Sequence, residues 1–167
     1  ARRPGLALAT LVGLILVAKA VLIAPRTDLF RFTSPPGLAL PAEYRSDLPM
    51  GPSVRLIGWD LPLSEVRQGG FLHVRLYWQA ITPLEEDYTS FVQLIGGPDQ
   101  REYGASTAMH AGQIPTSSWN TDFYIVDEHT IPIAADTPPV LFTLRVGLSP
   151  RNEQSRIGEL DLTPRVR

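Results

Sequence analysis

The chain has 167 residues, of which 44% are hydrophobic and 19% charged, with 16 prolines, 13 glycines and no cysteine. The lack of cysteine excludes a disulfide scaffold, a thiolate zinc site and an iron–sulfur cluster, and the many prolines and glycines argue against a helical bundle. Residues 1–31 carry a net charge of +4 and residues 32–167 a net charge of −6. An acidic body lacks the clustered cations that bind phosphate, so we expect no nucleic-acid partner.

Residues 5–24 form an apolar stretch whose only charged residue is Lys19. Twenty helical residues span about 30 Å, which is the thickness of the hydrocarbon core of a bilayer. Pro25 would end such a helix, and Lys19 lies close enough to that end to extend its ammonium group to the interface. We therefore expect residues 1–31 to contain a single transmembrane helix with its flanks, surrounded by membrane lipid.

Two features of this stem leave alternatives open. The segment Ala18-Lys19-Ala20 also fits the cleavage rule for a secretory signal peptide, although we expect an anchor that is retained in the cell membrane. The positive-inside rule does not decide the orientation, because the flanks carry similar numbers of cations. We expect an extracytoplasmic body, since a cysteine-free, proline-rich β domain after one helix is more often outside. Whether Ala1 follows a removed methionine or continues a longer precursor stays open.

Three small residues of the stem would lie on one face of such a helix. Gly5, Ala9 and Gly13 occupy positions i, i+4 and i+8. Small side chains let two helices approach closely in lipid, where packing drives association. We therefore expect this face to contact a helix of a partner subunit.

The rest of the chain divides into a linker and a β domain. Residues 32–53 contain five prolines and predict a stiff, extended linker. From residue 54 onward, short runs rich in branched and aromatic residues alternate with turn residues, which predicts strands. The predicted strands are 54–61, 71–80, 88–96, 101–108, 122–133, 141–149 and 156–162.

Hydrophobic residues alternate within these runs. One face of the second run carries Leu72, Val74, Leu76 and Trp78, the third places Tyr88, Ser90, Val92 and Leu94 together, and the sixth groups Phe142, Leu144, Val146 and Leu148. A period of two with one buried face is typical of antiparallel sheets. The sequence therefore predicts an all-β fold: an immunoglobulin-like antiparallel β-sandwich over residues 54–167, preceded by one transmembrane helix.

Six stretches also carry a resemblance to a known family. They are Val54–Leu63, Leu76–Pro83, Asp87–Leu94, Pro115–Trp119, Asp127–Pro132 and Leu144–Leu148. Together they resemble the C-terminal β-sandwich domain of multi-span membrane proteins from Chloroflexi-type bacteria, many of which are similar to dolichyl-phosphate-mannose-type glycosyltransferases. The resemblance covers about two-thirds of the chain and departs after Pro139, where the family pattern PPGxY is absent. It implies a sandwich outside the membrane and supplies no catalytic residue.

The titratable residues do not form a recognisable reactive set. His73, His110 and His129 fall in separate segments without metal-ligand spacing, so we expect no metal site. Asp127 and Glu128 are adjacent in a predicted strand and therefore point to opposite faces. A paired-carboxylate site would need a partner from another strand, which the sequence does not identify.

Other motifs of chemistry are also missing. The acidic run Glu85–Asp87 lacks the alternating spacing of a calcium loop and is interpreted as a solvated turn. The chain contains no nucleophile elbow, P-loop or dinucleotide fingerprint. We therefore predict that the protein is not an enzyme and holds no cofactor.

The stretch 109–121 is the best candidate for a functional loop, because it is long, polar and flanked by predicted strands. Its candidate interaction residues are His110, Gln113 and Trp119. We predict a non-catalytic, membrane-anchored accessory or assembly subunit whose sandwich contacts proteins of a larger membrane complex, with photosynthetic and respiratory complexes as candidate hosts. The alternatives are the C-terminal domain of a longer membrane glycosyltransferase and a carbohydrate-binding module built on exposed tryptophans.

Overall fold

The computed structural model describes residues 39, 41–61, 67–108, 111–150 and 158–166. All of them belong to one compact unit, Thr33–Arg167. Within these ranges, no helix combines the length and the apolar character needed to cross a bilayer. The predicted membrane helix, with Gly5, Ala9 and Gly13, lies outside the described residues and stays a prediction.

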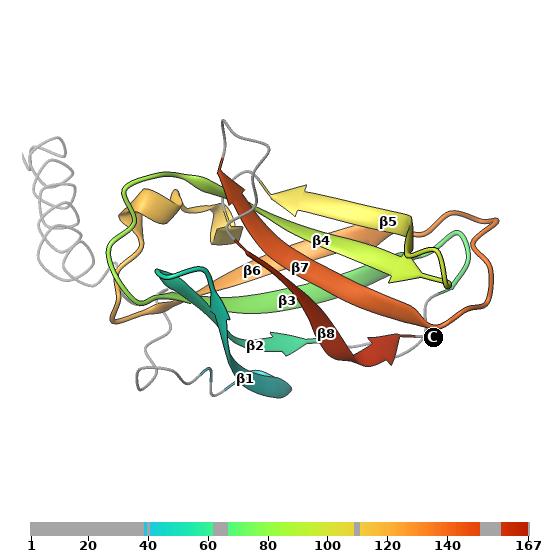
Figure 1. The fold of residues 1–167 in the computed structure, drawn as a ribbon, viewed down its shortest axis with the longest axis horizontal. Helices are drawn as coiled ribbons and strands as arrows, with labels where there is room; N and C mark the ends of the chain where they lie inside the picture. Colours follow the sequence, from blue (N-terminus) through green and yellow to red (C-terminus); the bar gives the residue numbers. More distant parts are fainter. Residues whose placement is uncertain (1–38, 40, 62–66, 109–110, 151–157, 167) are drawn as a thin grey trace, which may run out of the picture. The chain divides into compact units, whose positions relative to one another are not determined.

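Strands make up most of the described chain (Figure 1). In order, the elements are β1 (Tyr44–Met50), β2 (Val54–Asp60), β3 (Phe71–Ala80), β4 (Tyr88–Gly96), β5 (Arg101–Ala108), the 3-10 turns η3 (Ala111–Gln113) and η4 (Thr116–Ser118), β6 (Tyr124–Pro132), β7 (Phe142–Pro150) and β8 (Gly158–Val166). They form two antiparallel sheets with strand orders β1-β2-β3-β6 and β5-β4-β7-β8. Each predicted run overlaps one of β2 to β8, which confirms the all-β fold with two sheets.

The main core lies between the two sheets. The four inward side chains predicted for β3, from Leu72 to Trp78, and the four predicted for β7, from Phe142 to Leu148, are each at most 2% exposed. Complete burial of one large apolar side chain stabilises the fold by about 1.5–3 kcal/mol. The alternation in the sequence therefore identified the inner faces of both sheets correctly.

Residues 44–50 form a strand, although the sequence predicts a linker without sheet structure over residues 32–53. That prediction is wrong for this segment, because β1 pairs with β2 and forms one edge of its sheet. An edge strand needs hydrogen-bond donors on one side only, so it accommodates Pro49 opposite Arg55. The β domain therefore includes residues that precede position 54.

The residues just before β1 cover part of the outer face of the same sheet. They contribute to a second, smaller core that comprises Ala39, Ala42, Ile57, Tyr77 and Tyr124. Gly58 permits this close approach, because a Cβ at this position would lie 2.6 Å from Ala42 Cβ. Alternation predicts a solvated position for Tyr77, yet only 2% of this residue is exposed because the smaller core covers it.

Candidate functional site

The loop between β5 and β6 lies at the same end of the sandwich as the connection from β3 to β4 (Figure 1). Thr116 joins the two connections, because its hydroxyl accepts a hydrogen bond from Tyr88 N at 2.8 Å and donates one to Glu86 O at 2.9 Å. Asp87 Oδ1 accepts hydrogen bonds from Ser117 N at 3.1 Å and Ser117 Oγ at 2.7 Å. The last residue of the acidic turn therefore fixes the loop.

The three predicted interaction residues have different positions. Gln113 is exposed to solvent. Trp119 is only 5% exposed and belongs to the main core, so it anchors the loop and does not present its ring to a partner. His110 lies outside the described residues. The sequence pattern therefore located the loop but did not distinguish the buried anchor residue Trp119 from the exposed residue Gln113.

The exposed tip of the loop has an uncommon backbone conformation. Gly112 and Gln113 have φ angles of 63° and 62°, in the left-handed region. Glycine adopts this region freely, whereas glutamine does so at a cost, and such strain is concentrated at functional positions. The next residue, Ile114, is 37% exposed, and residues 111–121 carry no charged side chain. The tip therefore presents an uncharged surface of fixed shape.

A buried polar network supports this tip from inside the sandwich. Asp127 and His129, two residues apart on β6, both point inward and are 1% and 2% exposed. Glu128 between them is exposed on the opposite face, as strand geometry predicts. The partners that the sequence could not identify come from β3, β4 and β5, so the network connects the two sheets.

Asp127 accepts several hydrogen bonds. Its Oδ2 accepts from Trp78 Nε1 at 3.2 Å and lies 2.9 Å from His129 Nε2, and its Oδ1 accepts from Gly112 N at 3.1 Å. Burial by itself raises the pKa of this carboxyl group. The adjacent imidazole of His129, together with the donors Ser90 and Gly112, outweighs burial and holds the pKa of Asp127 below its ordinary value. The carboxylate is therefore a charged acceptor that fixes the loop at Gly112.

His129 lies between this carboxylate and two serines. Ser90 Oγ is 3.2 Å from His129 Nε2, and Ser106 Oγ is 3.1 Å from Nδ1. When Nε2 carries the proton, it donates to Asp127 and Nδ1 accepts from Ser106; when both nitrogens are protonated, Ser106 becomes the acceptor. The hydroxyl of Ser106 therefore satisfies the imidazole in either state.

The combination of serine, histidine and aspartate is the set that hydrolases use, but this arrangement differs from a catalytic one. Ser90 is fully buried and shares one imidazole nitrogen with Asp127. Among the described residues, neither Ser90 nor Ser106 lines the pocket of about 500 Å³, the one of about 670 Å³ or the one of about 510 Å³. A nucleophile has to reach a bound substrate, so we interpret the network as a cross-link between the sheets that also positions the loop.

A pocket of about 500 Å³ lies on the outer face of the sheet formed by β1, β2, β3 and β6. Arg75 crosses it, donating from Nε and Nη2 to Glu128 Oε1 at 3.0 and 2.8 Å and from Nη1 to Asp60 Oδ2 at 3.3 Å. The hydrogen bonds to Glu128 raise the pKa of Arg75. Tyr77 donates to Asp60 at 2.7 Å, and burial together with this bond raises the pKa of Tyr77 to about 12. These polar groups are therefore engaged with one another.

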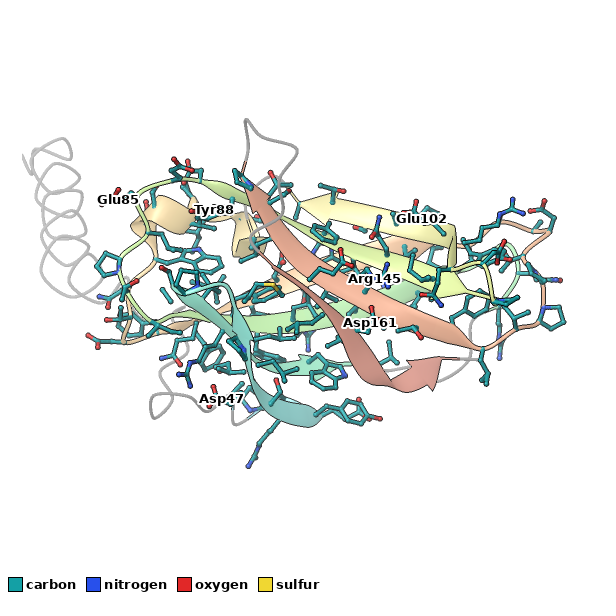
Figure 2. The ribbon with its side chains drawn as sticks, in the orientation of Figure 1. Asp47, Glu85, Tyr88, Glu102, Arg145 and Asp161 are labelled. Carbon is teal, nitrogen blue, oxygen red and sulfur yellow. The ribbon has the colours of Figure 1, made fainter. Side chains whose placement is uncertain are left out.

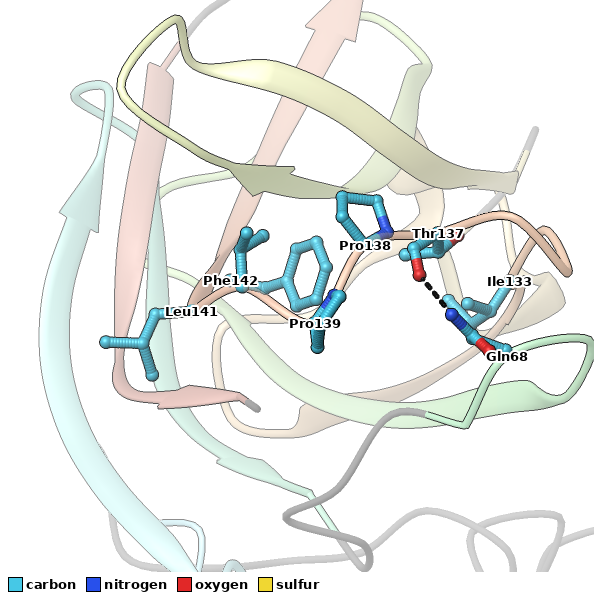
Figure 3. Close-up of a pocket in the computed structure, with 8 residues that line it drawn as sticks. Gln68, Ile133, Thr137, Pro138, Pro139, Leu141 and Phe142 are labelled. Atoms are coloured by element: carbon cyan, nitrogen blue, oxygen red, sulfur yellow. Dashed lines mark hydrogen bonds between the residues drawn. The ribbon is translucent and has the colours of Figure 1, made fainter.

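Charged side chains on the other sheet are also paired. Arg145 on β7 lies beside Asp161 on β8 (Figure 2), with 2.9 Å between Arg145 Nε and Asp161 Oδ1. A second pocket, of about 670 Å³, is lined by Gln68, Ile133 and residues 137–142 (Figure 3). Gln68 Nε2 donates to the backbone oxygen of Thr137 at 2.7 Å, and no residue of the lining is ionisable.

Within the described ranges, no three histidine, aspartate or glutamate side chains are grouped so that they could hold a metal ion.

The three tryptophans are buried. Trp59, Trp78 and Trp119 are 7%, 0% and 5% exposed. A carbohydrate-binding module of the kind considered from the sequence requires exposed rings, which these residues do not provide. Comparison with models of known protein families and with curated proteins gives no match.

Proposed function

We propose that this protein is a non-catalytic, membrane-anchored accessory subunit whose immunoglobulin-like, extracytoplasmic sandwich binds a partner protein through residues 111–122. The observation that carries the proposal is the exposed, uncharged tip at Gln113 and Ile114, which Asp127 fixes through Gly112 N. Charged residues are depleted in the centre of protein interfaces, and a preformed loop loses little entropy on binding.

The membrane part of the proposal depends on the sequence alone. The apolar residues 5–24 would hold the sandwich at the membrane surface, and the small residues Gly5, Ala9 and Gly13 would contact a helix of the same complex. Two contacts on one chain, one in lipid and one outside it, are suited to a subunit that stabilises an assembly.

The test is purification of the full-length chain from its membrane in mild detergent, followed by identification of co-purifying proteins. We expect Ile114→Asp to abolish co-purification, because it places a charge in the centre of the contact. Leu141→Asp is the matched control, since Leu141 is 47% exposed beyond the far end of β6. A chain that migrates alone, or an Ile114→Asp variant that retains every partner, would refute the proposal.

A further inference from the structure

A pocket of about 510 Å³ adjoins the proposed interaction loop. It lies at the end of β3, where Gln79 Nε2 donates to the backbone oxygen of Thr121 at 2.9 Å and so fixes the last part of the loop to the sheet. Asp122 follows in the loop and lines the pocket together with Asp47 and Arg55. The pocket therefore shares Thr121 and Asp122 with the segment to which we assign partner binding.

Ala80 and Ile81 form the apolar part of the pocket wall, which otherwise consists of polar and charged residues. Ile81 comes directly after β3 and is 39% exposed, although it carries a large aliphatic side chain. The buried Ala80 lies beside it in the lining. An aliphatic chain from a partner would pack against these residues and remove the apolar surface of Ile81 from water.

The polar part of the pocket favours a cation. Arg55 Nη1 donates to both oxygens of Asp47, at 2.7 and 2.8 Å, so these two charges compensate each other. The carboxylate of Asp122 has no hydrogen-bond or ion-pair partner among the described residues, and the lining therefore carries a net charge of −1. Asp122 therefore supplies the uncompensated negative charge of the lining, which Ala80 and Ile81 share with it.

The same geometry disfavours a carboxylate ligand. A guanidinium binds carboxylates best through two parallel N–H groups. In Arg55 the Nε atom is buried and without a partner, and Nη1 is occupied by Asp47. An incoming carboxylate would therefore meet only the remaining nitrogen of Arg55 and would be repelled by Asp122.

We propose that this pocket receives a lysine or arginine side chain of the partner protein, with its methylene groups on Ile81 and its cationic group at Asp122. Long cationic side chains characteristically bury their stem and keep the charged end near solvent. The inference rests on the proposed function, because it names the chemistry of the partner at the same surface.

The direct test uses the full-length chain in detergent and three blocked tripeptides, with lysine, norleucine or glutamate as the central residue. Isotope-edited NMR titration follows the backbone amides of Ala80, Ile81 and Asp122. We expect the lysine peptide to shift these amides saturably and the norleucine peptide, which has the stem without the charge, to bind about two- to fivefold more weakly. Equal binding by norleucine, tighter binding by glutamate, or no shift of these amides with the lysine peptide would overturn the proposal.

Variants separate this proposal from the proposed function. Asp122→Lys should weaken the lysine peptide more than tenfold, and Asp136→Lys, an equal charge change beyond the other end of β6, should leave binding unchanged. Circular dichroism confirms that both variants are folded. If Ile114→Asp abolishes co-purification of the partner while Asp122→Lys does not, the pocket proposal fails and the proposed function stands. If neither variant affects co-purification, the proposed function fails as well.

Discussion

Replacement of Asp127 by asparagine should destabilise the sandwich and release the loop. Three N–H donors converge on the two oxygens of this carboxylate: Gly112 N on Oδ1, and Trp78 Nε1 and His129 Nε2 on Oδ2. An asparagine amide has one oxygen and one NH₂ group, so in either orientation the NH₂ group faces a donor. The group that loses its acceptor is buried, and we expect a loss of about 2–4 kcal/mol in the free energy of unfolding.

The stability that Asp127 contributes should depend on pH. Because the folded state holds the pKa of Asp127 below the ordinary value of 3.8, the stability that it contributes is present above that value. This contribution is lost as the pH falls from about 4 through the lowered pKa. The stability difference between the wild type and Asp127→Asn should therefore be largest at neutral pH and shrink below pH 4.

Urea unfolding at several pH values, monitored by the fluorescence of the buried tryptophans, measures the stability difference between the wild type and Asp127→Asn. Hydrogen exchange of the Gly112 amide should accelerate in Asp127→Asn, because that amide loses its acceptor. Glu128→Gln is the matched control: the same chemical change one residue away, on a side chain that is 68% exposed, should cost less than about 1 kcal/mol. A difference below about 0.5 kcal/mol at pH 7, or one that does not vary between pH 7 and pH 3, would refute the role assigned to Asp127.

Three further predictions test the packing and the titration of the outer faces. Gly58→Ala should lower stability by about 1–3 kcal/mol, because the new methyl group enters the segment that covers the β1-β2-β3-β6 sheet; an unchanged melting temperature would contradict that close approach. Gly147→Ala should cost a similar amount, since its Cβ would overlap the ring of Phe91, and Phe91→Leu should restore part of the loss in the double variant. Tyr77→Phe should remove the hydrogen bond to Asp60. Because the folded state raises the pKa of Tyr77 to about 12, the wild type should lose stability between pH 10 and about pH 12, and the variant should lose less over this range. Identical alkaline unfolding curves of the two proteins would show that Tyr77 does not contribute.

The sequence by itself determined the strands from residue 54 onward and the inner faces of the sheets. Alternation alone assigned Leu72 to Trp78 and Phe142 to Leu148 to the core, because a period of two places every second side chain on one face of a strand. It also placed Asp127 and Glu128 on opposite faces. These features depend on neighbours along the chain and do not require knowledge of which strands pair.

Only the tertiary structure decided what covers each face and which side chains meet. Tyr77 is buried because Ala39 and Ala42, which precede it by 38 and 35 positions in the chain, cover the outer face of its sheet. Pro49 is tolerated in β1 because this strand lies at a sheet edge, a position that proline content does not reveal. The contacts of Asp127 with Gly112 and Trp78 join residues from separate elements. Such contacts depend on the pairing and stacking of strands, so the sequence found the loop while the fold determined how it is held.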